Sequence, residues 1–206
     1  KLEKKCYKAS ALITGQTQGI VNNIRQRFPG KEVSWLPNGV DISFYDPEKI
    51  PKSDFRQVNG FKDDDVIFFY GGILGHAQGL EIIIEAAKEL QSTHAQFVIQ
   101  GAGPEKEHLV ALHEKYALEN IHFLEPVAKS EMPGILKSVD IAIVPLKKLD
   151  LFKGAIPSKI FEALAMRKPL LLGVDGEARK HFIENAQAGL FYTPEDIDSL
   201  KTQVLY

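Results

Sequence analysis

A glycine-rich loop in the sequence has the make-up of a site for an anionic ligand. The loop, GGILGHAQG at residues 71–79, follows an apolar run at 66–70. Glycines let backbone N–H groups approach a ligand closely, and the start of a following helix favours negative charge. Of the six histidines, His76 lies in this loop and is the one we place near a site. No Gly-Lys-Ser/Thr follows, which excludes a Walker A phosphate loop; a glycine-rich turn without a ligand remains the alternative.

A second stretch, IPSKIFE at residues 156–162, places a hydroxyl, a cation and a carboxylate at the start of a predicted helix. Pro157 suits the first turn of a helix, and Ser158 can cap it. Lys159 and Glu162 are three residues apart and therefore share a face. Lys159 would attract a phosphate, and Glu162 could accept hydrogen bonds from a sugar diol. The alternative is a capped helix with a Lys–Glu pair on its surface.

Two further loops carry weaker signals. GAGP at residues 101–104 begins like a dinucleotide fingerprint but lacks the third glycine, so a nicotinamide dehydrogenase is a distant alternative. Lys147, Lys148 and Lys153 form a modest basic cluster. This cluster is either a solvated loop or a clamp for a diphosphate or an anionic lipid surface.

The composition excludes several classes of protein. The chain has 206 residues, with 25 Lys+Arg against 27 Asp+Glu, so we expect no nucleic-acid partner. Its one cysteine, Cys6, excludes an internal disulfide and any zinc pattern, and indicates a reduced, cytoplasmic protein. No apolar run is long enough to cross a bilayer. The chain lacks an initiator Met and stops inside a helical pattern, so we expect it to be part of a longer protein.

The elements that must position these loops alternate along the chain. Nearly unbroken apolar runs predict strands that are covered on both faces, and amphipathic segments between them predict helices. This alternation predicts an α/β fold with a doubly wound, mostly parallel six-stranded sheet. Ligands bind at the carboxyl ends of the strands in such sheets. The loops that follow residues 70, 100 and 145 should therefore lie at one edge. The predicted strands are 66–70, 96–100, 121–124, 140–145, 169–173 and 189–192, and the predicted helices are 79–90, 105–116, 130–138, 158–166, 177–185 and 195–202.

The first 60 residues do not follow this alternation. They predict a strand at 9–14, a helix at 16–28 and a strand at 33–36. A segment rich in Pro, Asp and Asn follows at 37–55 and is typical of a linker. We therefore divide the chain into a leading fragment with its linker, residues 1–60, and a main domain, residues 61–206.

Taken together, these motifs resemble the C-terminal, donor-binding domain of GT-B glycosyltransferases of family 4, also called group 1. The resemblance covers residues 66–204 and the preceding junction. Within the family, the segments AQGL and PSKIFEALA are similar to those of bacterial transferases of amino-deoxysugars such as N-acetyl-fucosamine. It implies a Rossmann-like domain that binds a nucleotide-sugar, here preceded by the tail of an acceptor-binding domain. The matching segments are PNGVD at 37–41, YGGILGHAQGL at 70–80, GAGP at 101–104, DIAIVPL…PSKIFEALAMRKPLL at 140–171 and AGLFYTPED at 188–196.

The resemblance implies roles for individual residues. Glu162 matches the second glutamate of the family's E-x(7)-E motif, which binds the donor ribose. Pro157, Ser158 and Lys159 match the helix start near the diphosphate. The other matches lie in loops: Gly71 and Gly72 beside the phosphates, Gly101 and Gly103 beside the nucleotide, and Val127 where the base is held by backbone contacts.

Three positions depart from the family's pattern. Gly154 stands where the first glutamate of E-x(7)-E would contact the sugar. Gly72 and Gln78 stand where the family has the Arg and Lys that bind the phosphates. The resemblance therefore leaves the phosphate-binding cation to one of three candidates, which are His76, Lys153 and Lys159.

From this resemblance we expect a retaining glycosyltransferase that uses a nucleotide-sugar, with a UDP-sugar as the expected donor. The acceptor would be a polysaccharide or a lipid-linked glycan bound by the missing domain. The expected enzyme needs no metal or other cofactor, and the identity of a catalytic residue stays open. Peripheral association with the inner face of a membrane is also open. The alternatives are a non-catalytic nucleotide-sugar-binding module and an epimerase or hydrolase of sugar nucleotides.

Overall fold

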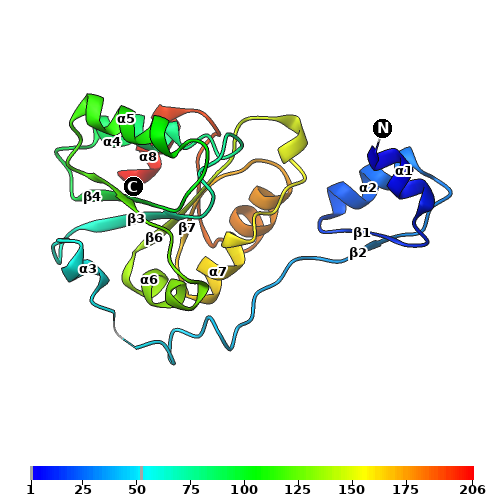
Figure 1. Cartoon of the computed structure of the whole chain (residues 1–206), viewed down its shortest axis with the longest axis horizontal. Coiled ribbons are helices and arrows are strands. Elements are labelled where there is room, and N and C mark those ends of the chain that lie inside the picture. Colours follow the sequence, from blue (N-terminus) through cyan, green and yellow to red (C-terminus); the bar gives the residue numbers. More distant parts are fainter. Residues whose placement is uncertain (1, 52) are drawn as a thin grey trace.

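The computed structural model describes residues 2–51 and 53–206, which form two units joined by a linker (Figure 1). We call residues 2–36 the N-terminal unit and residues 55–206 the sheet domain. Lys1 and Lys52, which the predicted ranges include, lie outside the described residues. Among the described residues, no helix has the length and apolar character needed to cross a bilayer.

The sheet domain is built on six parallel strands in the order β5-β4-β3-β6-β7-β8. This order is that of a doubly wound dinucleotide-binding fold, so the predicted fold class is confirmed. The order in which successive strands are added reverses between β3 and β6, and such folds bind their ligands at this point. The strands are β3 (Val66–Gly71), β4 (Ala95–Gln100), β5 (Ile121–Leu124), β6 (Ile141–Pro145), β7 (Leu170–Gly173) and β8 (Gly189–Phe191).

Helices cover both faces of this sheet (Figure 1). On one face α4 (Glu81–Glu89), α5 (Lys106–Tyr116) and α8 (Ile197–Val204) pack on the largest apolar cluster. On the other face lie α3, α6 and α7, with the bounds Phe55–Val58, Met132–Ser138 and Lys159–Ala165. Short turns η1 (Lys129–Glu131) and η2 (Asp150–Phe152) and a π-helical segment, η3 (Arg179–Asn185), complete the domain.

Burial explains why the strands could be predicted from unbroken apolar runs. All four residues of β7 are buried, as are five of the six residues of β4. A strand covered on both faces has no solvent side on which polar residues could alternate. The predicted strands therefore agree with the observed ones to within one or two residues.

The N-terminal unit contains a two-stranded parallel sheet, β1 (Ile13–Gly15) and β2 (Val33–Trp35), with α1 (Leu2–Ala9) and α2 (Gln18–Arg27). The predicted strand at 9–14 is wrong over residues 9–12, because Ala9 ends α1 and residues 10–12 are irregular. This helix has no buried residue and is held by an Arg27–Glu3 ion pair of 2.7 Å and by Tyr7 packing on Phe28. Such contacts between distant residues leave no local apolar signal.

The linker between the units is attached to the sheet domain. Lys137 of α6 donates hydrogen bonds from Nζ to the carbonyl oxygens of Pro47, at 2.9 Å, and Ile50, at 2.5 Å. Tyr45 is 3% exposed and packs in the cluster beneath α6. The linker therefore contributes side chains to the sheet domain, although its sequence predicts only irregular structure.

Candidate functional site

The loops after β3, β4 and β6 are hydrogen-bonded to one another at the carboxyl edge of the sheet. The N–H of Gly72 donates to the carbonyl of Gln100, and the N–H of Leu74 donates to the carbonyl of Ala102, each at 2.9 Å. The N–H of Lys147 donates to Ala77 at 3.0 Å. The three loops therefore lie at one edge, as the sequence predicts.

Glycines make this close approach of the loops feasible. Gly101 has a φ of +147°, and a methyl group at its Cα would lie 1.8 Å from the carbonyl oxygen of Gly72. Gly103 has a φ of +159°, and its methyl group would lie 2.2 Å from the carbonyl oxygen of Leu74. No other residue type fits these positions without moving the loops. Gly103 thus has a packing role beneath the loop.

A pocket of about 400 Å³ opens at this edge, close to the point where the strand order reverses. Its walls come from the loops after β3, β4 and β5 and from α7. Five predicted site residues line it: Gly71, Gly72, Gly101, Val127 and Glu162. Sequence reasoning missed Ile73, Gln100 and Met132, which line it too. These three are apolar or strand-end residues that carry no motif of their own.

Lys159 lies next to this pocket, in the first turn of α7. Its Nζ lies 4.9 Å from the ring centroid of Tyr70, and a methyl group on Gly72 would lie 3.2 Å from it. Among the described residues no carboxylate lies within 4.0 Å of this ammonium group. Burial lowers the pKa of Lys159, and the Glu162 carboxylate opposes that shift. Within residues 2–51 and 53–206, this side chain is therefore a cation held beside Gly72 without an ion-pair partner.

Glu162, one helical turn after Lys159, borders more than one cavity. Besides the pocket at Gly71 and Gly72, it lines a cavity of about 350 Å³ formed largely by the linker. The buried Tyr45 lines this linker cavity as well. Burial raises the pKa of Tyr45 to about 12, and the neighbouring Glu162 carboxylate adds to the shift. The linker thus reaches the carboxylate predicted to bind a ribose, a contact that the sequence does not reveal.

Three predicted residues with polar side chains lie away from the pocket. His76 is exposed and pairs through Nδ1 with Glu105 at 2.7 Å. Lys153 pairs with Asp150 at 2.8 Å. Gln78 turns back on its own loop, since a methyl group on Gly75 would lie 2.9 Å from its Oε1. Of the three cations considered from the sequence, only Lys159 lies at the pocket.

The helix start at residues 157–158 differs from its prediction. Ser158 occupies the N-cap position of α7, but its hydroxyl makes no capping hydrogen bond. The backbone of Ser158 is already helical, with φ −61° and ψ −29°, whereas a capping side chain needs an extended backbone. Pro157 and Ser158 do not line the pocket described above.

Gly154 lies outside the pocket and faces the N-terminal unit. A methyl group on Gly154 would lie 3.7 Å from the Cα of Gly19. The hydroxyl of Thr17 donates to the carbonyl of Gly154 at 2.6 Å. The position that resembles the family's sugar-contacting glutamate is therefore a contact between the two units.

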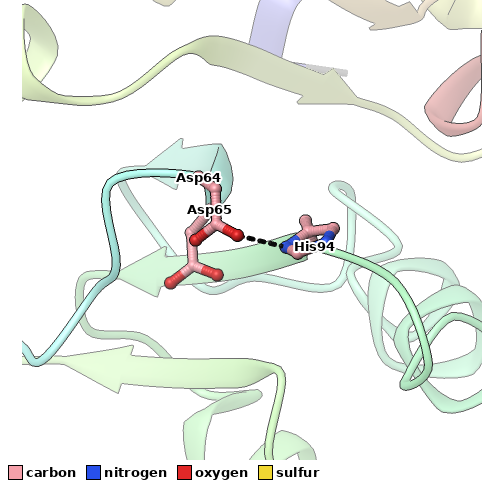
Figure 2. Close-up of side chains that lie close together, drawn as sticks. All are labelled: Asp64, Asp65 and His94. Atoms are coloured by element: carbon pink, nitrogen blue, oxygen red, sulfur yellow. Dashed lines mark ion pairs between the residues drawn. The ribbon is translucent and has the colours of Figure 1, made fainter.

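At the opposite end of the sheet, Asp64, Asp65 and His94 lie close together (Figure 2). Their ligand atoms all lie within 4.8 Å of one another, and His94 Nδ1 pairs with Asp64 at 3.2 Å. Asp65 accepts the N–H of Lys62 at 2.7 Å. Carboxylate and imidazole groups are ligand types for a cation, and the sequence spacing did not reveal this cluster. It flanks the amino ends of β3 and β4, away from the pocket.

Comparison with known families matches residues 51–206 to the family described as Glycosyl transferases group 1. The chain belongs to the group 1 glycosyltransferases. The match covers the sheet domain and part of the linker. The resemblance stated from the sequence motifs is therefore confirmed at the level of the family, while the N-acetyl-fucosamine branch stays a prediction.

Curated group 1 relatives are bacterial glycosyltransferases. The chain is 28% identical over 146 residues to the putative colanic acid biosynthesis glycosyl transferase WcaI of Escherichia coli, covering 69% of this chain and 35% of the relative. It is 25% identical over 209 residues to the alpha-D-kanosaminyltransferase of Streptomyces kanamyceticus, covering 97% and 52%. The chain thus spans about half or less of the length of these relatives.

A solved structure agrees with the GT-B architecture expected of a group 1 glycosyltransferase. Anabaena Alr3699/HepE, in complex with UDP and glucose, superposes with a TM-score of 0.78 at 19% identity. The superposition covers 97% of this chain and 54% of that one. It includes the N-terminal unit as well as the sheet domain, so the fold likeness extends beyond the residues matched by the family.

Proposed function

We propose that this chain is the donor-binding part of a retaining glycosyltransferase that takes a UDP-sugar. The observation that carries the proposal is the pair Lys159 and Glu162. They place an ammonium group, which has no ion-pair partner in the part of the chain that the structure describes, and a carboxylate beside one glycine-lined pocket, where the strand order reverses. A nucleoside diphosphate offers both matching groups: phosphate oxygens for the cation and ribose hydroxyls for the carboxylate.

The proposed arrangement of the donor follows the pocket from end to end. The base lies against the backbone at Val127, and the ribose hydroxyls donate to Glu162. The diphosphate lies beside Gly71 and Gly72, within reach of Lys159. Lys159 thus takes the role of the Arg and Lys that the family carries at the positions of Gly72 and Gln78.

The choice of UDP draws on the relatives. The Anabaena structure contains UDP and glucose, and the Escherichia coli relative is named for colanic acid biosynthesis. By analogy we propose a UDP-sugar donor and a polysaccharide or lipid-linked acceptor. The acceptor would be held by the domain that the N-terminal unit completes.

The proposed contribution to catalysis is electrostatic. When the bond between sugar and diphosphate breaks, negative charge grows on the leaving phosphate oxygens. A fixed ammonium group in a partly desolvated site stabilises that charge without a metal ion. We therefore propose donor binding that is independent of divalent cations.

One observation favours a second candidate, a module that binds nucleotide-sugar without transferring it. The position of the family's sugar-contacting glutamate is Gly154, and the N-terminal unit occupies the space in front of it. Such a module would bind UDP and its sugars with similar affinity and leave the sugar uncleaved.

Calorimetric titration of this chain with UDP, GDP, ADP and NAD in EDTA tests the proposal. We expect binding of UDP alone, with a dissociation constant that EDTA does not change. Binding of NAD instead, or of no nucleotide, would contradict it. A panel of UDP-sugars, added to the protein extended by its complete first domain, then separates transfer from binding without turnover.

A further inference from the structure

The start of α2 in the N-terminal unit is held by a carboxylate of the sheet domain. The N–H groups of Gln18 and Gly19 donate to Oε1 and Oε2 of Glu177, each at 2.8 Å. The first N–H groups of a helix have no partner within the helix itself. A residue 159 positions away supplies two of those partners here.

Thr17 completes the same contact. Its Oγ1 accepts the N–H of Ile20 at 3.2 Å, which caps α2. The same hydroxyl donates to the carbonyl of Gly154 at 2.6 Å. Thr17 is 1% exposed, although it is polar and lies at a loop end. One residue therefore both begins the helix and joins it to the sheet domain.

Glycines on both sides let the two backbones meet. A methyl group on Gly19 would lie 3.3 Å from the Cα of Gly154 and 3.1 Å from Oε2 of Glu177. A methyl group on Gly19 would therefore crowd the carboxylate that holds α2, whereas one on Gly154 would make an ordinary contact with Gly19 at 3.7 Å.

The segment that presents Glu177 is itself fixed. Gly176 has a φ of +83°, and a methyl group on it would lie 2.2 Å from the carbonyl oxygen of Lys153. The N–H of Glu177 donates to that same carbonyl at 2.8 Å. Residues 153–154 and 176–177 thus form one backbone platform that receives α2.

The electrostatics of this contact favour it strongly. A carboxylate that accepts two backbone N–H groups forms charge-assisted hydrogen bonds. The positive end of the helix dipole adds to the attraction. The Glu177 side chain is only 14% exposed, so solvent and salt screen it less than a surface charge.

We propose that Glu177 is a positioning residue that docks the N-terminal unit on the sheet domain through the start of α2. The docking itself stands on the contacts above. Its consequence rests on the proposed function: the orientation of the acceptor domain over the donor pocket sets the rate of transfer. Glu177 does not line that pocket, so donor affinity should not depend on it.

Amide hydrogen exchange, followed by NMR on the ¹⁵N-labelled chain, tests the docking directly. In Glu177→Gln we expect the amides of Gln18 and Gly19 to exchange at least about tenfold faster. The variant loses the negative charge and one of the two carboxylate oxygens that accept these N–H groups. Glu184→Gln is the matched control, since Glu184 lies in the same segment but pairs with Arg179 at 3.1 Å. Exchange at both amides should be unchanged in the control.

A second variant probes the same contact from the other side. Gly19→Ala introduces the methyl group that would crowd Glu177 and Gly154, while alanine is the better helix former. We expect faster exchange at the same two amides without loss of α2. Unchanged exchange in both Glu177→Gln and Gly19→Ala would overturn the docking.

Two activity readouts separate this inference from the proposed function. Glu177→Gln should keep the UDP affinity of the chain within about twofold and, in the protein extended by its first domain, lower kcat with the donor KM unchanged. An unchanged kcat would overturn the positioning role. If the wild-type chain binds no UDP, the proposed function fails, and the exchange data still decide the docking.

Discussion

Two cavities with cationic side chains lie at the carboxyl edge of the sheet, and they differ in how those cations are paired. The pocket beside β3 and β4 has Lys159 at its edge, without a carboxylate within 4.0 Å among the described residues. A second cavity of about 290 Å³, beside β6, β7 and β8, has more cations. There Lys153 pairs with Asp150, and Arg179 pairs with Asp175 and Glu184. Lys147 and Lys148 line the same cavity, and in the described part of the chain no carboxylate lies within 4.0 Å of either ammonium group. Lys159, by contrast, is buried deeply enough that its pKa is lowered.

The difference shows that burial of an unpaired cation, more than the number of charges, indicates an anion site. The lysine cluster at 147–153 is conspicuous in the sequence. Its exposed ion pair, between Lys153 and Asp150, contributes little free energy and already gives Lys153 a partner. A partly buried ammonium group without a partner costs free energy. A bound diphosphate would offset that cost at Lys159. The less conspicuous lysine is therefore the better candidate for the phosphate contact.

The largest effect is expected from a substitution that disrupts the backbone of the pocket and so lowers the free energy of unfolding. Gly101→Ala places a methyl group 1.8 Å from the Gly72 carbonyl oxygen, at a φ of +147°. We expect a loss of about 3 kcal/mol in unfolding free energy and a fall in Tm of about 6–12 °C. Calorimetry measures both. Gly39→Ala, where the added methyl group meets no atom within 4 Å, is the control and should change Tm by about 1 °C or less.

The next largest effect is expected on UDP affinity, and one lysine substitution in each cavity compares the two directly. Lys159→Ala should weaken UDP binding about 100-fold, since it removes a charge-assisted contact of about 1.5–3 kcal/mol. Lys153→Ala, in the second cavity, should change affinity less than about twofold. Titration calorimetry on both variants decides between the cavities. A larger loss in the Lys153 variant would move the phosphate contact to the second cavity.

Glu162→Ala should weaken UDP binding by about 10- to 100-fold, because the ribose hydroxyls lose a charged acceptor. Uracil and inorganic diphosphate, which lack the ribose, give the specificity control: diphosphate affinity should not fall in this variant. An unchanged UDP affinity would remove Glu162 from the site.

The smallest expected effect is a pH dependence. Burial lowers the pKa of Lys159 below its usual 10.5, so the ammonium group loses its proton at a lower pH than an exposed lysine does. UDP affinity should therefore fall a few-fold as the pH rises from neutral towards the lowered pKa of Lys159. Lys159→Arg, which stays protonated, should show a flatter profile in the same titration. Parallel profiles would separate Lys159 from the phosphates.

The sequence predicted what local patterns determine and missed what long-range contacts determine. The six strands could be predicted because burial on both faces leaves unbroken apolar runs. Glu162 and Lys159 could be predicted because their spacing on one helix is local. The contact between Tyr45 and Glu162 joins the linker to α7, and no residue near either one signals it.

Gly154 shows the same limit most clearly. Its departure from the family's pattern can be seen in the sequence, but the partner that fills the space, Gly19, lies in another unit. The capping role of Ser158 was wrong because the hydrogen bond depends on a backbone angle, which a residue type alone does not fix. Motif spacing therefore located the pocket but not the contacts between units.

The attachment of the linker to the sheet domain has a consequence for relative motion. Leu36 is hydrogen-bonded to Gly15 in the N-terminal unit, and Val40 already packs on the sheet domain. The intervening hinge consists of Pro37, Asn38 and Gly39. The ring of Pro37 fixes its own φ, so few torsion angles remain to be changed. Opening of the two units about this short pivot would be confined to a narrow set of rotations.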